Sequence, residues 1–293
     1  MLALALRLGS AFSFATLLAL VKYVGQRGVA LPEIMFWRQF ICVPLLLGWL
    51  AMTGNLPTLR TRRIRAHGGR ALVGMSNMVL NFGSYILLPL AEATVLGFTT
   101  PLFAVLIAAL VLRQHVGPWR WTAVLVGLAG VIILARPSGE PIPPLGAAMA
   151  LTCAFLIAVI NYQIRDLGRT ESPACTVFWF SLFGSLLTAP LLPFVMKHHS
   201  PIEWLMVIGL GVLGLSGQML MTASLRYAAV STVVVMDYTA LIWATIYGWL
   251  VWDKLPPGST FLGAPLIIAA GVVIAWRQHR LSREVAVSST END

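Results

Sequence analysis

Three polar residues in the apolar stretch 71–90 have the spacing of a single helix face: Asn77, Asn81 and Tyr85. Residues four apart in an α-helix lie one above the other on the same side. An amide group offers a carbonyl oxygen to an ammonium and NH2 donors to a carboxylate. Asn81 aligns with Gln218 of the stretch 203–224, and two such amides facing one cavity would suit a zwitterion. The alternative is hydrogen bonding between helices, a common role of amides in membranes.

Asp237 is the one acidic residue well inside an apolar stretch, 229–251. It lies about 12 Å from the start of that stretch at about 1.5 Å per residue. A carboxylate at this depth is a natural candidate for proton coupling. Its role can also be structural, through a hydrogen bond to Tyr238 or a salt bridge with an arginine near the membrane edge. Both interpretations stay open on the sequence.

Aromatic residues near these polar groups predict a wall for an apolar substrate side chain: Phe98, Tyr238 and Trp243. Pro101 predicts a kinked or unwound helix beside them, and broken helices mark substrate sites in transporters. Packing or lipid contact is the alternative for Trp243.

Two further polar groups lie nearer the ends of apolar stretches. Arg38 predicts either attraction of an anionic group or, in preference, snorkelling or pairing with Glu33 or Glu92. The segment Asn161–Gln163 predicts gate or interface residues, with Asn161 as a candidate for contact with substrate.

The composition requires a membrane around these residues. The chain has 293 residues, of which 58% are hydrophobic and only 11% charged, whereas a soluble domain is about 25% charged. The net charge of +9 does not indicate nucleic-acid binding, because the basic residues lie at the ends of apolar stretches, where they set orientation. Each span needs about 20 apolar residues. Ten stretches meet this need, at about 3–24, 33–53, 71–90, 93–112, 119–136, 145–164, 173–194, 203–224, 229–251 and 259–277.

Lysine and arginine counts predict the orientation of these spans. With both termini in the cytoplasm, 14 of these residues lie on the cytoplasmic side and 5 on the other, with Arg38 inside a span. Such an asymmetry is the positive-inside pattern of a multi-pass protein. The apolar N-terminus has no basic leading region and is interpreted as a retained first helix.

A similar pattern occurs twice in the chain. "LAEATVL" precedes "GLAGVIILAR" within 86–136, and "YAAVSTV" precedes "AAGVVIAWR" within 223–277. Because each half has five spans, the second half enters the membrane in the opposite sense, as an inverted repeat. The linker Arg136–Pro144 is the predicted boundary. The alignment pairs Asn81 with Gln218, Tyr85 with Thr222, Thr100 with Asp237, and Pro101 with Tyr238.

The residues argue against catalysis and metal binding. The three cysteines, Cys42, Cys153 and Cys175, have no ligand-like spacing, so packing is the predicted role. The string "GLSG" at Gly214–Gly217 matches a rhomboid-protease pattern, but all five histidines lie in loops or at the ends of apolar segments, so the serine lacks a base at membrane depth. We therefore expect no enzyme, no cofactor and no metal.

The ten spans, the five-plus-five duplication and the string "LRYAAVSTVVVMDYTALIWATIYGWLVW" resemble the drug/metabolite transporter (DMT) superfamily in its ten-helix EamA branch, close to its aromatic amino-acid exporters. The chain departs from the family where Gly-Glu often follows the fourth and ninth spans, since it has Arg113-Gln114 and Trp252-Asp253. The predicted fold is an all-α integral membrane protein of ten transmembrane helices in two inverted-topology five-helix repeats. The divisions are 1–139, 140–280 and a disordered cytoplasmic tail at 281–293.

The resemblance implies a secondary transporter of the bacterial inner membrane, functional as a monomer, that exports amino acids or related small metabolites by alternating access. Its cavity would be formed by spans 1, 3, 4, 6, 8 and 9. An exchanger of nucleotide sugars or sugar phosphates is the alternative, and it needs several basic residues at cavity depth. The candidate substrate-binding residues are Asn77, Asn81, Tyr85, Phe98, Pro101, Asn161, Gln218, Thr222, Tyr238 and Trp243, with Asp237 as coupling candidate.

Overall fold

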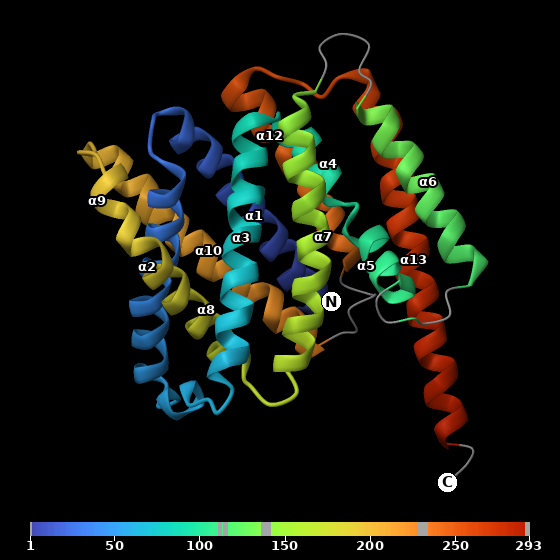
Figure 1. The fold of residues 1–293 in the computed structure, drawn as a ribbon, viewed down its shortest axis with the longest axis horizontal. Helices are drawn as coiled ribbons and strands as arrows, with labels where there is room; N and C mark the ends of the chain where they lie inside the picture. Colours follow the sequence, from blue (N-terminus) through green and yellow to red (C-terminus); the bar gives the residue numbers. More distant parts are fainter. Residues whose placement is uncertain (1, 111–112, 114–116, 136–141, 228–233, 291–293) are drawn as a thin grey trace.

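A computed structural model describes residues 2–110, 113, 117–135, 142–227 and 234–290. These residues form helices and connecting turns (Figure 1). The elements are α1 (Leu2–Gln26), α2 (Leu31–Met52), η1 (Leu56–Leu59), α3 (Ile64–Leu87), α4 (Leu90–Gly97), α5 (Thr100–Leu110), α6 (Pro118–Ala135), α7 (Pro144–Leu167), α8 (Pro173–Thr188), η2 (Ala189–Leu191), α9 (Leu192–Val195), α10 (Pro201–Tyr227), η3 (Val234–Thr239), α12 (Ala240–Trp252) and α13 (Gly258–Thr290).

The predicted fold class, an all-α membrane protein with ten spans in two inverted repeats, is confirmed. Among the described residues, six helices are long and apolar enough to cross a membrane, and the apolar segments of α6 and α13 are shorter. The fourth predicted span consists of α4 followed by α5, and the described part of the ninth consists of η3 followed by α12. A helix satisfies all its backbone hydrogen bonds internally, which lipid demands.

The packing of the helices repeats between the halves. Helix α1 packs against α10, and α7 packs against α3, which are equivalent pairs when the two halves are exchanged. The contacts of α1 with α12 and of α7 with α5 are equivalent in the same way. Helices α6 and α13 pack on each other at one side of the bundle (Figure 1). A Cβ at Gly130 of α6 would lie 2.9 Å from the carbonyl oxygen of Gly263, so glycine permits this close approach.

The fourth span is interrupted rather than kinked at Pro101. Helix α4 ends at Gly97, and α5 begins at Thr100. Pro101 therefore lies in the first turn of a new helix, where the missing N–H is harmless. The hydroxyls of Thr99 and Thr100 donate to the carbonyls of Leu96 and Gly97, at 2.6 and 2.9 Å, and partly satisfy the interrupted backbone.

Helix α13 continues to Thr290, into the segment 281–293 for which the sequence predicts disorder. The segment "RLSREVA" at 280–286 consists mainly of residues with good helix propensity, so an existing helix can extend through it. Residues 291–293 lie outside the described part of the chain.

Candidate functional site

The three residues of the predicted polar face of α3 differ in burial and in hydrogen bonding. The Oδ1 atom of Asn77 is buried and has no hydrogen-bond partner among the described residues. Asn81 is half-buried. Tyr85 is buried, and its hydroxyl lies 3.1 Å from the Thr94 hydroxyl of α4. The Thr94 hydroxyl also donates to the Leu90 carbonyl at 2.7 Å, so Tyr85 is held against the start of the fourth span.

The polar residues predicted on the partner helices are more dispersed. Asn161 is exposed on α7. Gln218 of α10 is half-buried and has a partner of its own. The side chain of Thr222 lies outside the described part of the chain. The predicted opposition of Asn81 and Gln218 therefore stays a prediction.

The aromatic residues divide into two contacts. Phe98 meets Tyr238 edge to face with ring centroids 4.9 Å apart, so the fourth and ninth spans touch here. The Tyr238 hydroxyl packs on Gly271 of α13, close to Pro101, and occupies the space that a Cβ at Gly271 would need. Trp243 instead packs on Phe12 of α1, with centroids 4.8 Å apart. The structure thus brings together Phe98, Pro101 and Tyr238 and places Trp243 against a different helix.

Asp237 forms a two-point salt bridge with Arg7 of α1. The Arg7 Nε donates to one carboxylate oxygen at 2.6 Å, and Nη2 donates to the other at 2.5 Å. The Arg7 side chain is 10% exposed and that of Asp237 is 38% exposed. Bidentate pairing of this kind fixes geometry as well as adding energy. This contact is the salt bridge with an arginine that the sequence offered as the structural alternative to coupling.

The expectation that Arg38 snorkels or pairs with Glu33 or Glu92 is wrong: the side chain is buried, and no ion pair joins it to either glutamate in the described part of the chain. Arg38 is buried, and its Nη1 donates to Gln39 Oε1 at 3.0 Å. Glu33 instead contacts His199, whose Nε2 lies 2.5 Å from its Oε1. Glu33 is five residues before Arg38 on the same helix, so the two side chains point to different sides.

A second buried arginine, Arg70 of α3, was missed because the sequence assigned it to a loop. It is 8% exposed and stacks on Phe180 at 4.6 Å from the ring centroid. Its Nε and Nη1 atoms, and the Nε atom of Arg38, have no hydrogen-bond partner among the described residues. Burying unpaired donors is costly unless a ligand or water satisfies them.

A cavity of about 190 Å³ lies where the C-terminal ends of α1, α3 and α12 meet the start of α4. Lys22 crosses one wall and donates to the carbonyls of Tyr85 at 2.9 Å and Leu88 at 2.6 Å, capping the end of α3. Glu92 is 4% exposed, and its Oε2 has no partner among the described residues. The lining residues are Lys22, Gln26, Ile86, Leu87, Leu88, Pro89, Leu90, Ala91, Glu92, Ala244, Gly248, Trp252, Lys254, Leu255 and Pro256.

The sequence places Lys22 at the outer membrane edge and offers Glu92 only as one possible partner of Arg38, so this cavity was missed. One signal was available in the sequence. Lys22 lies near the end of the first span, and Glu92 lies beside the short turn between the third and fourth spans, so both are at span ends. Both repeats contribute to the walls, since α12 belongs to the second.

Buried charges and a cavity between two inverted repeats define a membrane transporter. The profile of the EamA-like transporter family matches residues 1–136 and 144–276. The chain belongs to this family and is a multi-pass membrane protein.

Curated relatives share the transport function but differ in what they carry. The pseudopaline exporter of Pseudomonas aeruginosa is 27% identical over 270 residues, covering 91% of this chain and 93% of the relative. The riboflavin transporter of Vibrio cholerae is 27% identical over 284 residues, covering 94% of each. The S-adenosylmethionine uptake transporter of Rickettsia felis is 25% identical, covering 88% and 87%.

A solved crystal structure matches with a TM-score of 0.64 and 23% identity, covering 95% of this chain and 98% of the other. At this identity the likeness shows the fold alone.

Proposed function

We propose that this protein is a secondary transporter that exports amino acids and related small zwitterionic metabolites across a bacterial inner membrane. It acts as a monomer with both termini in the cytoplasm. The observation that carries the proposal is the cavity of about 190 Å³ bordered by a buried lysine and a buried glutamate, Lys22 and Glu92. One further support is that S-adenosylmethionine, which a relative is named for transporting, contains an amino acid.

The chemistry of the cavity suits a zwitterion. The unpartnered Oε2 of Glu92 accepts hydrogen bonds from the substrate ammonium. The ammonium of Lys22 already donates to backbone carbonyls, so it contributes its charge to the cavity, and Lys254 adds a second positive charge for the substrate carboxylate. Trp252 and Leu90 offer apolar surface to a side chain.

Alternating access needs one closed end and one open end. Arg7 and Lys22 are fifteen residues apart on α1, about 22 Å at about 1.5 Å per residue. The Arg7–Asp237 salt bridge therefore holds the end of the bundle opposite the cavity. On the predicted orientation, the salt bridge closes the cytoplasmic side while the cavity faces outward. The predicted residues Asn77, Asn81, Tyr85, Phe98, Pro101, Asn161, Gln218, Thr222, Tyr238 and Trp243 then contact substrate along the path between them, and Asp237 is the candidate for coupling.

Transport by purified protein in proteoliposomes tests this proposal. A panel of radiolabelled amino acids is offered with and without a proton gradient, and Glu92→Gln is compared with Glu203→Gln, a carboxylate at the start of α10 away from the cavity. We expect transport of at least one amino acid, lost in Glu92→Gln and kept in Glu203→Gln. Exchange of nucleotide sugars with no movement of any amino acid contradicts the proposal.

The buried guanidinium groups of Arg38 and Arg70 favour a second candidate, an exchanger of anionic metabolites such as sugar phosphates. Neither forms an ion pair with a carboxylate in the described part of the chain. Counterflow of sugar phosphates that Arg70→Gln abolishes would support this candidate. No counterflow by the unmodified protein excludes it.

A further inference from the structure

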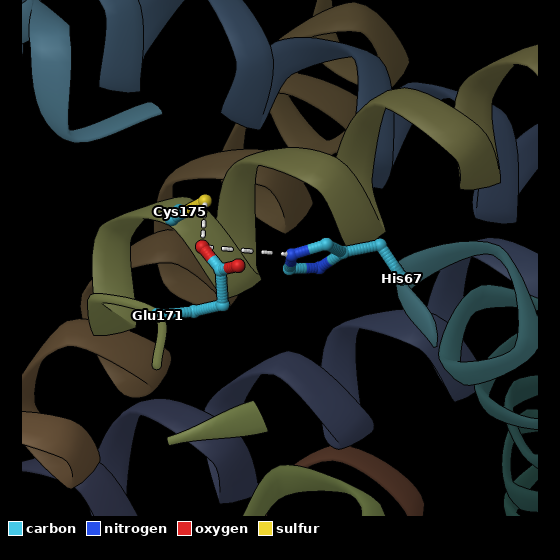
Figure 2. Close-up of side chains that lie close together, drawn as sticks. All are labelled: His67, Glu171 and Cys175. Carbon is cyan, nitrogen blue, oxygen red and sulfur yellow. Dashed lines mark hydrogen bonds and ion pairs between the residues drawn. The ribbon is translucent and has the colours of Figure 1, made fainter. Parts of the chain in front are cut away.

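Three side chains that bind transition metals lie together where α3 and α8 begin: His67, Glu171 and Cys175 (Figure 2). One donor atom from each lies within 4.8 Å of the other two. The Cys175 thiol contacts Glu171 Oε2 at 3.2 Å, and His67 Nε2 lies 4.0 Å from the same oxygen. We propose that these residues form a zinc site, independent of the substrate cavity.

The state of His67 points to a ligand. Its side chain is 1% exposed, yet neither ring nitrogen has a hydrogen-bond partner among the described residues. Figure 2 shows a ring nitrogen turned toward the Glu171 carboxylate. A buried polar group left without a partner is costly. A metal bound to Nε2 removes that cost for one nitrogen.

The surroundings orient the other two ligands. Thr61 donates to the Oε1 of Glu171 at 2.8 Å, which leaves Oε2 facing the cysteine and the histidine. Such contacts behind a ligand fix its direction in metal sites. Cys175 lies in the first turn of α8, capped by Ser172, whose hydroxyl accepts from the Cys175 N–H at 3.1 Å. Zinc binds the thiolate, so binding releases the thiol proton.

The distances suit tetrahedral zinc. Zinc bonds of about 2.0–2.3 Å place neighbouring ligand atoms about 3.3–3.7 Å apart. The thiol–carboxylate distance of 3.2 Å is just below the lower end of this range. The imidazole nitrogen is 4.0 Å from Glu171 Oε2, and the ligand atoms lie within 4.8 Å of one another, so the imidazole must approach by up to about 1 Å. One nitrogen, one oxygen and one sulfur ligand favour zinc over magnesium or calcium, which prefer oxygen alone. Water would complete the coordination.

The site joins the two repeats. His67 belongs to the first repeat, whereas Glu171 and Cys175 belong to the second. A hydrogen bond beside the cluster also joins the two repeats: the Trp179 indole donates to the Leu59 carbonyl at 3.0 Å. Bound zinc would therefore hold α3 against α8 at the end of the bundle predicted to face the cytoplasm.

Metal analysis of the purified full chain, with its affinity tag removed, tests the site. We expect about one zinc per chain after dialysis against dilute zinc. Cys175→Ser and His67→Gln should each lower the bound zinc at least tenfold. The matched controls are Cys153→Ser, a buried free cysteine on α7, and His198→Gln, an exposed histidine, and both should retain the metal.

Cobalt substitution keeps the test decisive if a variant fails to fold. The unmodified protein with cobalt should show a thiolate-to-metal charge-transfer band, which Cys175→Ser loses and Cys153→Ser keeps. Zinc should also raise the thermal midpoint of the unmodified protein and leave that of Cys175→Ser unchanged. Absence of the cobalt band in the unmodified protein, or equal zinc loss in cluster and control variants, overturns the proposal.

Discussion

The charged side chains at the two ends of α1 have different kinds of partner. Near the start of α1, Arg7 forms a salt bridge in which both carboxylate oxygens of Asp237 accept its hydrogen bonds. Near its end, Lys22 donates to backbone carbonyls, and the neighbouring Glu92 keeps a buried oxygen without a partner in the described chain. A paired charge holds helices together, whereas an unpaired buried charge needs a ligand. We therefore infer that the Arg7 end of the bundle closes the transport path and that the Lys22 end binds the substrate.

Glu92→Gln should have the largest effect on this comparison. It removes the carboxylate that we assign to the substrate ammonium, and losing one partner of a buried charge pair costs about 3 kcal/mol, or roughly a hundredfold in transport rate. Initial rates in proteoliposomes measure the loss. If Glu92→Gln transports as well as Glu203→Gln, the cavity end is not where substrate binds.

Lys22→Met should mainly destabilise the protein, because Lys22 donates its hydrogen bonds to the backbone and offers the substrate only its charge. The buried carbonyls of Tyr85 and Leu88 at the end of α3 lose their charged donor, at a cost of about 2 kcal/mol. The thermal midpoint in detergent should fall, and that of Lys197→Met, an exposed lysine, should not. An unchanged midpoint for Lys22→Met would show that water takes over the hydrogen bonds of the lysine and that these carbonyls are open to solvent.

Arg7→Asp tests the closed end. Two carboxylates would face each other, so we expect the salt bridge to open and transport to fall about tenfold, or about 1.4 kcal/mol. The exchanged pair, Arg7→Asp with Asp237→Arg, should recover most of the rate. If the exchange recovers transport but abolishes its dependence on a proton gradient, Asp237 also has a coupling role. Failure of the exchange to recover any transport contradicts a purely ionic contact.

Asn81→Ala should have the smallest of these effects, because the half-buried amide is one of several polar groups on the proposed path. We expect about a fivefold loss of transport, roughly 1 kcal/mol, from one neutral hydrogen bond to substrate. The amount of folded protein should not change. Transport equal to that of Asn55→Ala, an exposed loop amide, would favour the interhelical role for Asn81.

Much of the fold was predictable because lipid leaves few choices. Apolar stretches long enough to cross the bilayer must be helical, and the described helices follow the predicted spans. The break at Pro101 was expected as a kink or unwinding, and the structure gives the break as a new helix start at Thr100. The tail was harder, because composition at 281–293 resembles a loop while local helix propensity extends α13 to Thr290.

The candidate site was predictable only in part. The sequence identified Phe98, Pro101 and Tyr238, which do lie together, because aromatic and proline residues stand out in apolar stretches. It paired Arg38 wrongly and assigned Arg70 to a loop, because the depth and direction of a side chain depend on where a helix begins and which helices surround it.

The sequence by itself determined the membrane environment, the spans and the duplication, since each depends on composition and periodicity along the chain. Only the tertiary structure decided which charges meet. Arg7 and Asp237 are separated by 230 residues. His67 and Cys175 come from different repeats, yet they lie in one cluster with Glu171. Such contacts depend on how the helices pack in three dimensions. The hydropathy of a span does not show which other helices will lie beside it.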